Sequence, residues 1–135
     1  ILIVDDSSLA RENIRIGLTQ LGFINILEAS SGQEGILKLI NAEKLNLNIE
    51  LVITDWIMPN MSGLDFIKKA RAFPRWKNLP FIMLTARSTV QDVTNALAEG
   101  VTYYLLKPST PANLERSLKA TWKVYNSSKK TEGSP

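Results

Sequence analysis

Short runs of apolar and β-branched residues alternate along the chain with segments in which apolar residues recur at helical spacing. The runs predict five strands, at residues 1–4, 24–29, 51–54, 81–84 and 101–106. Continuous apolar runs are typical of strands that are buried on both faces of a parallel sheet. The run at 24–29 includes Asn25 and Glu28, so we expect that strand in a more exposed position.

A helical segment follows each predicted strand. Ser7 or Ser8 can cap the first helix, which Gly22 ends, and Pro111 is a favourable first residue for the last helix. The third helix is expected at about 64–72. The fourth helix carries an apolar stripe on one side, and the stripe of the fifth is assigned mainly to the core: Val90, Val93 and Leu97 in the fourth, and Leu114, Leu118, Trp122 and Tyr125 in the fifth.

The alternation of strands and helices predicts an α/β fold with right-handed crossovers. We expect a flavodoxin-like (βα)5 three-layer sandwich, in which a five-stranded parallel sheet has the order 2-1-3-4-5. The chain of 135 residues suits one domain, which we place at residues 1–126. Residues 127–135 are rich in Ser, Lys, Thr, Gly and Pro and are expected to form a flexible C-terminal tail or the start of a linker.

Composition narrows the classes of function. The chain is 44% hydrophobic and 21% charged, as in ordinary soluble domains. It has no apolar run of the roughly 18–20 residues that span a membrane, and it opens on a strand rather than a signal peptide, so a cytoplasmic protein without a membrane partner is expected. Because Cys and His are absent, disulfides, Ser-His-Asp catalysis and the usual zinc sites are excluded. The net charge of +3 is spread over several helices, so nucleic-acid binding by this domain is not expected.

Polar residues stand where the predicted strands end. Asp5 and Asp6 follow the first strand, Asp55 follows the third, Thr85 the fourth and Lys107 the fifth. In the order 2-1-3-4-5 the first and third strands are neighbours, and all carboxyl ends share one edge of the sheet. We therefore expect three carboxylates, a hydroxyl and an ammonium group to meet in one crevice.

Three carboxylates in one crevice repel each other, by about 4 kcal/mol for each pair at about 4 Å and an effective dielectric constant near 20. A hard divalent cation relieves this repulsion, and an all-oxygen ligand set points to Mg²⁺ or Mn²⁺. Lys107 supplies a point charge for a phosphate group and Thr85 a hydrogen-bond donor. Asp55 is the candidate nucleophile, since a carboxylate can attack phosphorus to form an acyl phosphate.

This set of residues resembles the receiver domain of the response regulators of bacterial two-component systems. The resemblance covers residues 1 to about 126, and residues 54–59 with Gly63 are similar to the CheY-like branch. It implies that Asp55 accepts a phosphoryl group from the phosphohistidine of a sensor histidine kinase or phosphotransfer protein. It also implies that Asp6, Asp55 and the backbone carbonyl of Ile57 bind Mg²⁺, with Asp5 reaching the metal mainly through water.

The resemblance further implies a conformational switch. Thr85 moves toward the phosphate and the ring of Tyr104 turns inward behind it. The surface of the fourth helix, fifth strand and fifth helix then changes its affinity for a downstream protein, and a homodimer through this face is compatible with the pattern. Such a domain is a signalling protein that catalyses only its own phosphorylation and slow autodephosphorylation.

The sequence departs from the family pattern beside the expected phosphate. Ile57 stands two positions after Asp55, where CheY has a polar residue, and Arg87 stands two positions after Thr85. Our hypothesis is that these bulky side chains slow dephosphorylation. Ser109 replaces the aromatic residue that usually follows Lys107-Pro108, and the resemblance implies a cis peptide bond between Lys107 and Pro108.

Other interpretations remain open from the residues alone. Asp5 and Asp6 can cap the first helix, Thr85 can be an ordinary strand-end residue, and Trp56 can be either a partly exposed reporter of the site or plain packing. A Mg²⁺-dependent phosphohydrolase of the haloacid dehalogenase type would also use Asp, Thr and Lys, but it needs an Asp where Ile57 stands. A flavodoxin-like FMN carrier is disfavoured by the three carboxylates, and a degenerate scaffold by the intact site.

Overall fold

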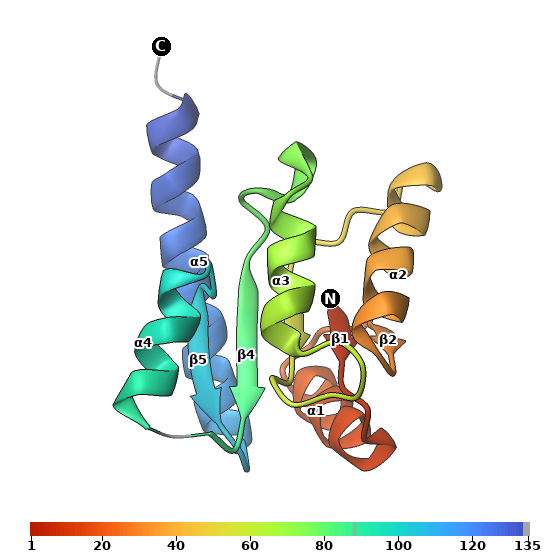
Figure 1. The fold of residues 1–135 in the computed structure, drawn as a ribbon, viewed down its shortest axis with the longest axis vertical. Helices are drawn as coiled ribbons and strands as arrows, with labels where there is room; N and C mark the ends of the chain where they lie inside the picture. Colours follow the sequence, from red (N-terminus) through yellow and green to blue (C-terminus); the bar gives the residue numbers. More distant parts are fainter. Residues whose placement is uncertain (88, 134–135) are drawn as a thin grey trace.

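The computed structural model describes residues 1–87 and 89–133, with side chains described through residue 123. Its five strands form one parallel sheet in the order β2-β1-β3-β4-β5 (Figure 1). The predicted α/β fold and strand order are thus confirmed. The strands are β1 (Leu2–Val4), β2 (Leu27–Ala29), β3 (Val52–Thr54), β4 (Phe81–Thr85) and β5 (Tyr103–Leu106). The helices are α1 (Ser8–Gln20), α2 (Gly32–Lys44), α3 (Gly63–Arg71), α4 (Val90–Ala98) and α5 (Pro111–Gly133), with a short 3-10 helix η1 (Pro74–Trp76) after α3.

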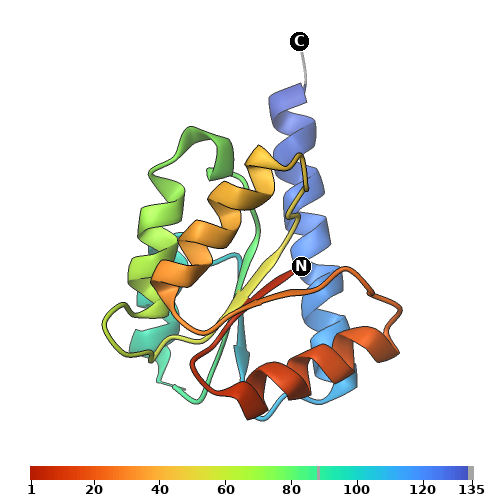
Figure 2. The same ribbon diagram turned by 90° about the vertical axis from the view of Figure 1, so that its right-hand side faces the viewer.

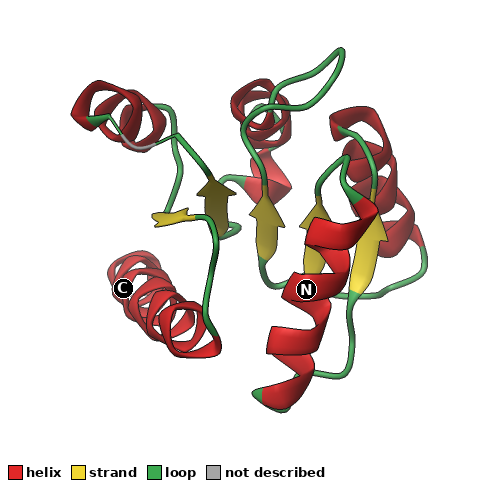
Figure 3. Cartoon of the chain, turned by 90° about the horizontal axis from the view of Figure 1, so that it is seen from below, coloured by secondary structure: helices red, strands yellow, loops and turns green. Residues whose placement is uncertain are grey.

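The sheet lies between two layers of helices. Helices α1 and α5 cover one face, and α2, α3 and α4 cover the other (Figure 3). Alternate residues of the central strands point to opposite faces, so both sides of each strand are buried. Ile53 packs toward α1 and α5, whereas Val52 packs toward α2 and α3. Each fully buried side chain of this size stabilises the fold by about 1.5–3 kcal/mol. Because burial on both faces requires apolar residues at successive positions, the continuous apolar runs predicted the sheet correctly.

Side-chain caps fix where several helices begin. The Ser7 hydroxyl accepts a hydrogen bond from the Ala10 backbone N–H at 3.2 Å, which satisfies a donor that the first turn of α1 leaves free. Of the two candidates that the sequence offered, Ser7 and Ser8, the cap is Ser7. Gly22, just beyond α1, has a φ of 97°, a conformation that side chains with a Cβ rarely adopt.

Helix α5 is longer than expected. The sequence predicted an end near residue 126 and a flexible tail at 127–135, but the helix continues to Gly133. The last turns of α5 extend beyond the other elements in Figures 1 and 2. No Gly or Pro lies between Pro111 and Gly133 to interrupt the helix. The polar composition of the last residues was therefore not enough to end the helical hydrogen bonding. A domain boundary at residue 126 stays a prediction.

The apolar stripe of α5 lies only partly in the core, and that of α4 is largely exposed. Val90 of α4 is 83% exposed, and the residue of α4 that is fully buried is Ala96. Trp122 of α5, which we had assigned to the core, is 60% exposed, and the side chain of Tyr125 lies outside the described residues. Helical periodicity shows that a helix has an apolar side but not whether another element covers it.

Candidate functional site

The carboxyl ends of β1, β3, β4 and β5 meet at the lower end of the sheet in Figure 1. The parallel register places Val4 beside Thr54, and the Asp55 N–H donates to the Val4 carbonyl at 3.0 Å. At the next strands, the Lys107 N–H donates to the Thr85 carbonyl at 2.9 Å. Main-chain pairing therefore delivers the polar residues to one place, as the strand order predicted.

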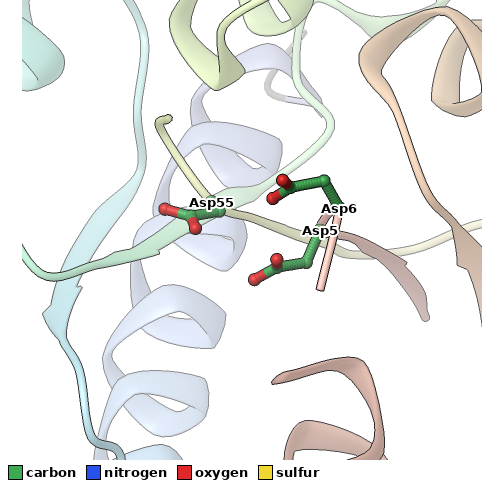
Figure 4. Close-up of side chains that lie close together, drawn as sticks. All are labelled: Asp5, Asp6 and Asp55. Carbon is green, nitrogen blue, oxygen red and sulfur yellow. The ribbon is translucent and has the colours of Figure 1, made fainter. Parts of the chain in front are cut away.

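Three carboxylates lie together in this crevice. Asp5, Asp6 and Asp55 each offer one oxygen, and these oxygens lie within 4.8 Å of one another (Figure 4). Asp5 is 1% exposed, Asp55 is partly buried and Asp6 is exposed, so the cluster is open to solvent on the Asp6 side. Oxygen ligands at this spacing, with one open side, fit a hard divalent cation such as Mg²⁺ or Mn²⁺.

Lys107 joins two of these carboxylates. Its Nζ donates to Asp5 Oδ2 and to Asp55 Oδ2, both at 2.9 Å. Burial raises the pKa of the Asp5 carboxyl group, although the Ser7 N–H and Lys107 act in the opposite direction. Burial alone would lower the pKa of Lys107, but its hydrogen bonds to Asp55 and Asp5 outweigh this and raise it. Lys107 therefore stays charged, and its peptide bond to Pro108 is cis, as the resemblance implied.

The loop after β3 folds back tightly behind Asp55. The Asp55 Oδ1 accepts the Trp56 N–H at 2.6 Å, and the Gly63 N–H donates to the Trp56 carbonyl at 2.7 Å. A Cβ atom at position 63 would lie 1.8 Å from the Asp55 carbonyl oxygen, so only glycine fits there. This turn leaves the side chain of Ile57 63% exposed beside the site.

The remaining predicted residues come from β4, β5 and the loop after β4. Thr85 is buried, and its hydroxyl lies 3.5 Å from the Arg87 N–H. The Tyr104 hydroxyl donates to the Arg87 carbonyl at 2.5 Å, so the hydroxyl is held at the surface while the ring is partly buried against the core. Burial, and next the charge of Asp92, raise the pKa of Tyr104, which keeps this hydroxyl a donor.

Sequence reasoning missed an aromatic and cationic cluster at the rim. The guanidinium of Arg87 lies over the ring of Trp56, and Trp56 meets the ring of Tyr104 edge to face, with centroids 6.3 Å apart. Trp56 is buried, so of the two alternatives that the sequence left open, packing describes it better. In the sequence, only the position of Trp56 directly after Asp55 pointed to this cluster. The contacts with Arg87 and Tyr104 join separate loops and strands, so they leave no local pattern along the chain.

A parallel sheet of this order, with an acidic trio and a lysine at its carboxyl edge, defines a receiver domain of the CheY type. The chain belongs to the response regulator receiver domain family, whose sequence model matches residues 1–119. It is thus a signalling domain of two-component systems. No helix among the described residues has both the length and the apolar character that crossing a membrane requires.

Curated relatives and solved structures agree with this family. The chain is 43% identical to chemotaxis protein CheY1 of Helicobacter pylori over 118 residues, which cover 87% of this chain and 92% of that protein. It is 41% identical to a CheY homolog of Campylobacter jejuni, covering 87% and 88% of the two chains. The structure of CheY4 of Vibrio cholerae matches with a TM-score of 0.78 and 31% identity, covering 89% of this chain and 95% of that one. CheY in a CheX-CheY-BeF3-Mg complex from Borrelia burgdorferi matches with a TM-score of 0.81 and 30% identity, covering 90% and 87%.

Proposed function

We propose that Asp55 is the phosphoacceptor of a two-component signalling switch. The observation that carries the proposal is the Asp55 carboxylate at the tip of β3, 2.9 Å from the Lys107 ammonium and beside two further carboxylates. An Asp55 oxygen attacks the phosphorus of a phosphohistidine, the P–N bond breaks, and the imidazole keeps the bonding electrons and takes up a proton. The chain has no His, so a partner, a sensor histidine kinase or phosphotransfer protein, supplies this group.

The charges of the site suit phosphoryl transfer. Lys107 and the Thr85 hydroxyl would bind the phosphoryl oxygens. Asp6, Asp55 and the Ile57 carbonyl would hold Mg²⁺ or Mn²⁺, with Asp5 acting mainly through water. When bound, the cation would neutralise the carboxylates and the charge on the phosphoryl oxygens. The domain catalyses only its own phosphorylation and a slow autodephosphorylation, which Ile57 and Arg87 restrain.

The output is a change of surface. Thr85 moves toward the phosphoryl group and Tyr104 leaves the Arg87 carbonyl and turns inward, which alters the face formed by α4, β5 and α5. Exposed apolar residues on this face, Val90, Leu97 and Leu106, support its role in docking a downstream protein or a second copy of the chain. We place the protein in the cytoplasm, where such kinases present their phosphohistidine, without a membrane or nucleic-acid partner for this domain.

Phosphorylation by a small donor tests the proposal. Mg²⁺ and then acetyl phosphate are added while intact mass and tryptophan fluorescence are recorded. We expect a Mg²⁺-dependent gain of one phosphoryl group that is lost in Asp55→Asn and retained in Asp65→Asn, an exposed control on α3. Mg²⁺ binding without any gain, from acetyl phosphate or a phosphohistidine donor, would instead indicate a scaffold. Release of phosphate over many turnovers from phosphomonoesters would indicate a hydrolase.

A further inference from the structure

Hydrogen bonds connect both main-chain groups of Asp5 to the end of β2, one directly and one through the side chain of Arg11. The N–H of Asp5 donates to the Ala29 carbonyl at 3.1 Å. Its carbonyl accepts a hydrogen bond from Nη1 of Arg11 at 2.6 Å, and the Nε of Arg11 is paired with Glu28 Oε1 at 3.2 Å. Arg11 thus bridges the first acidic residue of the site to the edge strand.

The contact between Arg11 and the Asp5 carbonyl also affects the position of Asp6. This carbonyl belongs to the planar peptide group that joins Asp5 to Asp6, so a fixed carbonyl also fixes the backbone N and Cα atoms of Asp6. Among the described residues no hydrogen bond or ion pair holds the exposed Asp6 carboxylate, whereas Lys107 holds those of Asp5 and Asp55. The direction of the Asp6 side chain therefore depends on its backbone.

We propose that Arg11 is a positioning residue for the metal-binding carboxylates and acts through the Asp5 carbonyl. The inference rests on the proposed Mg²⁺ site. Its planar guanidinium suits the task, because it donates to a carbonyl and to a carboxylate at the same time. Groups that orient metal ligands from behind change metal affinity by about 10- to 100-fold when they are removed.

Charge and position predict opposite effects of removing Arg11. A positive charge near the site disfavours a cation, so loss of that charge alone would tighten Mg²⁺ binding. Loss of the contact with the Asp5 carbonyl would weaken it. The sign of the change therefore separates the two effects.

Arg15 provides a matched control. It lies one turn along α1 and pairs with the same Glu28 carboxylate. The side chain of Arg15 is 47% exposed, against 17% for Arg11, and it pairs with Glu28 rather than with the Asp5 carbonyl. Arg15→Gln removes the same charge from the same ion-pair group and leaves the Asp5 carbonyl bound.

Calorimetric titration with Mg²⁺ alone, on protein shown to be folded by circular dichroism, tests the inference. We expect Arg11→Gln to weaken Mg²⁺ binding about tenfold and Arg15→Gln to change it by less than about twofold. Arg11→Lys should recover only part of the loss, because one ammonium cannot reproduce the two-sided contact. If Arg11→Gln does not fold, Arg11→Lys keeps the positive charge but not the two-sided contact, so it should still bind Mg²⁺ more weakly than the unaltered chain.

The outcomes distinguish this inference from the proposal on which it rests. Equal affinities in Arg11→Gln and Arg15→Gln, or tighter binding in Arg11→Gln, would overturn the role of Arg11 while leaving the metal site intact. A lower unfolding midpoint with unchanged Mg²⁺ affinity would also overturn it, because that is the result of a purely structural role. Absence of Mg²⁺ binding by the unaltered chain would overturn the metal site itself, and this inference with it.

Discussion

The guanidinium carbon of Arg87 lies 4.6 Å from the centre of the Trp56 ring. This contact connects the loop after β4 to Trp56, which follows Asp55 in the loop after β3. The Nε atom of Arg87 also lies 3.9 Å from the Asp92 carboxylate of α4. Arg87 therefore links the residue that follows Asp55 to the first turn of a helix in the proposed output face. We propose that phosphorylation of Asp55 would influence α4 through this link.

Replacing Arg87 should loosen this link. We expect Arg87→Gln to lower the free energy of unfolding by about 0.5–1 kcal/mol, the usual value of a cation–π contact at an exposed site. Urea unfolding followed by tryptophan fluorescence measures the change. Arg116→Gln, at an exposed position of α5, is the control and should be close to neutral. Equal effects of the two substitutions would show that the stacking on Trp56 contributes nothing.

Removing the Lys107 ammonium should make stability depend more strongly on Mg²⁺. In Lys107→Met the buried Asp5 carboxylate keeps the Ser7 N–H at 2.9 Å but loses its charged partner, so the free energy of unfolding should fall by about 1–3 kcal/mol. Thermal unfolding with and without Mg²⁺ checks this. The cation should raise the midpoint more in the variant than in the unaltered chain, because more repulsion remains for it to relieve.

Lys119→Met serves as the control for that experiment. Lys119 is exposed and pairs with Glu115 along α5, so its loss should leave the response to Mg²⁺ unchanged. A Lys107→Met variant that gains no more from Mg²⁺ than this control would contradict the prediction.

Exposed Ile57 should lengthen the life of the phosphorylated state. A polar side chain at this position can hold and direct the attacking water, whereas an alkyl group cannot. We therefore expect Ile57→Asn to shorten the half-life of phosphoaspartate severalfold, as measured by the loss of phosphoryl mass in excess Mg²⁺. Leu45→Asn, which replaces another exposed apolar residue beyond α2, should leave the half-life unchanged. An unchanged or longer half-life in Ile57→Asn would refute the hypothesis.

The sequence predicted the convergence of Asp5, Asp55, Thr85 and Lys107 because parallel strands bring their carboxyl ends to one edge. That argument needs only the strand order and the residues that follow each strand. It could not reach Arg11, whose contact with the Asp5 carbonyl depends on where the start of α1 lies relative to the ends of β1 and β2. Side-chain contacts between separate elements have no period along the chain, so they require the three-dimensional structure.

The same limit explains the surface errors. Helical periodicity assigned Trp122 of α5 to the core, but its side chain is exposed, as is that of Val90 on the apolar side of α4. Whether an apolar side is covered depends on neighbouring elements, and an uncovered one is itself informative, since it marks a surface that partners can use.

Tyr104 provides a test of the switch that does not require a partner protein. Its hydroxyl bond to the Arg87 carbonyl favours the outward ring, and a hydrogen bond of this kind contributes about 1 kcal/mol. Tyr104→Phe removes that preference, so the ring should turn inward more readily. Because ligands that favour one conformation bind more tightly when its cost falls, the affinity for the phosphoryl mimic beryllofluoride with Mg²⁺ should rise up to about fivefold.

Tyr103→Phe is a matched control for this prediction, because Tyr103 is the preceding residue of β5 and packs on the opposite face of the sheet. Its affinity for beryllofluoride should stay that of the unaltered chain, as judged by tryptophan fluorescence titration. If Tyr104→Phe binds the mimic no more tightly than Tyr103→Phe, the outward hydrogen bond does not restrain the switch. The position of Tyr104 would then follow from packing against Trp56 alone.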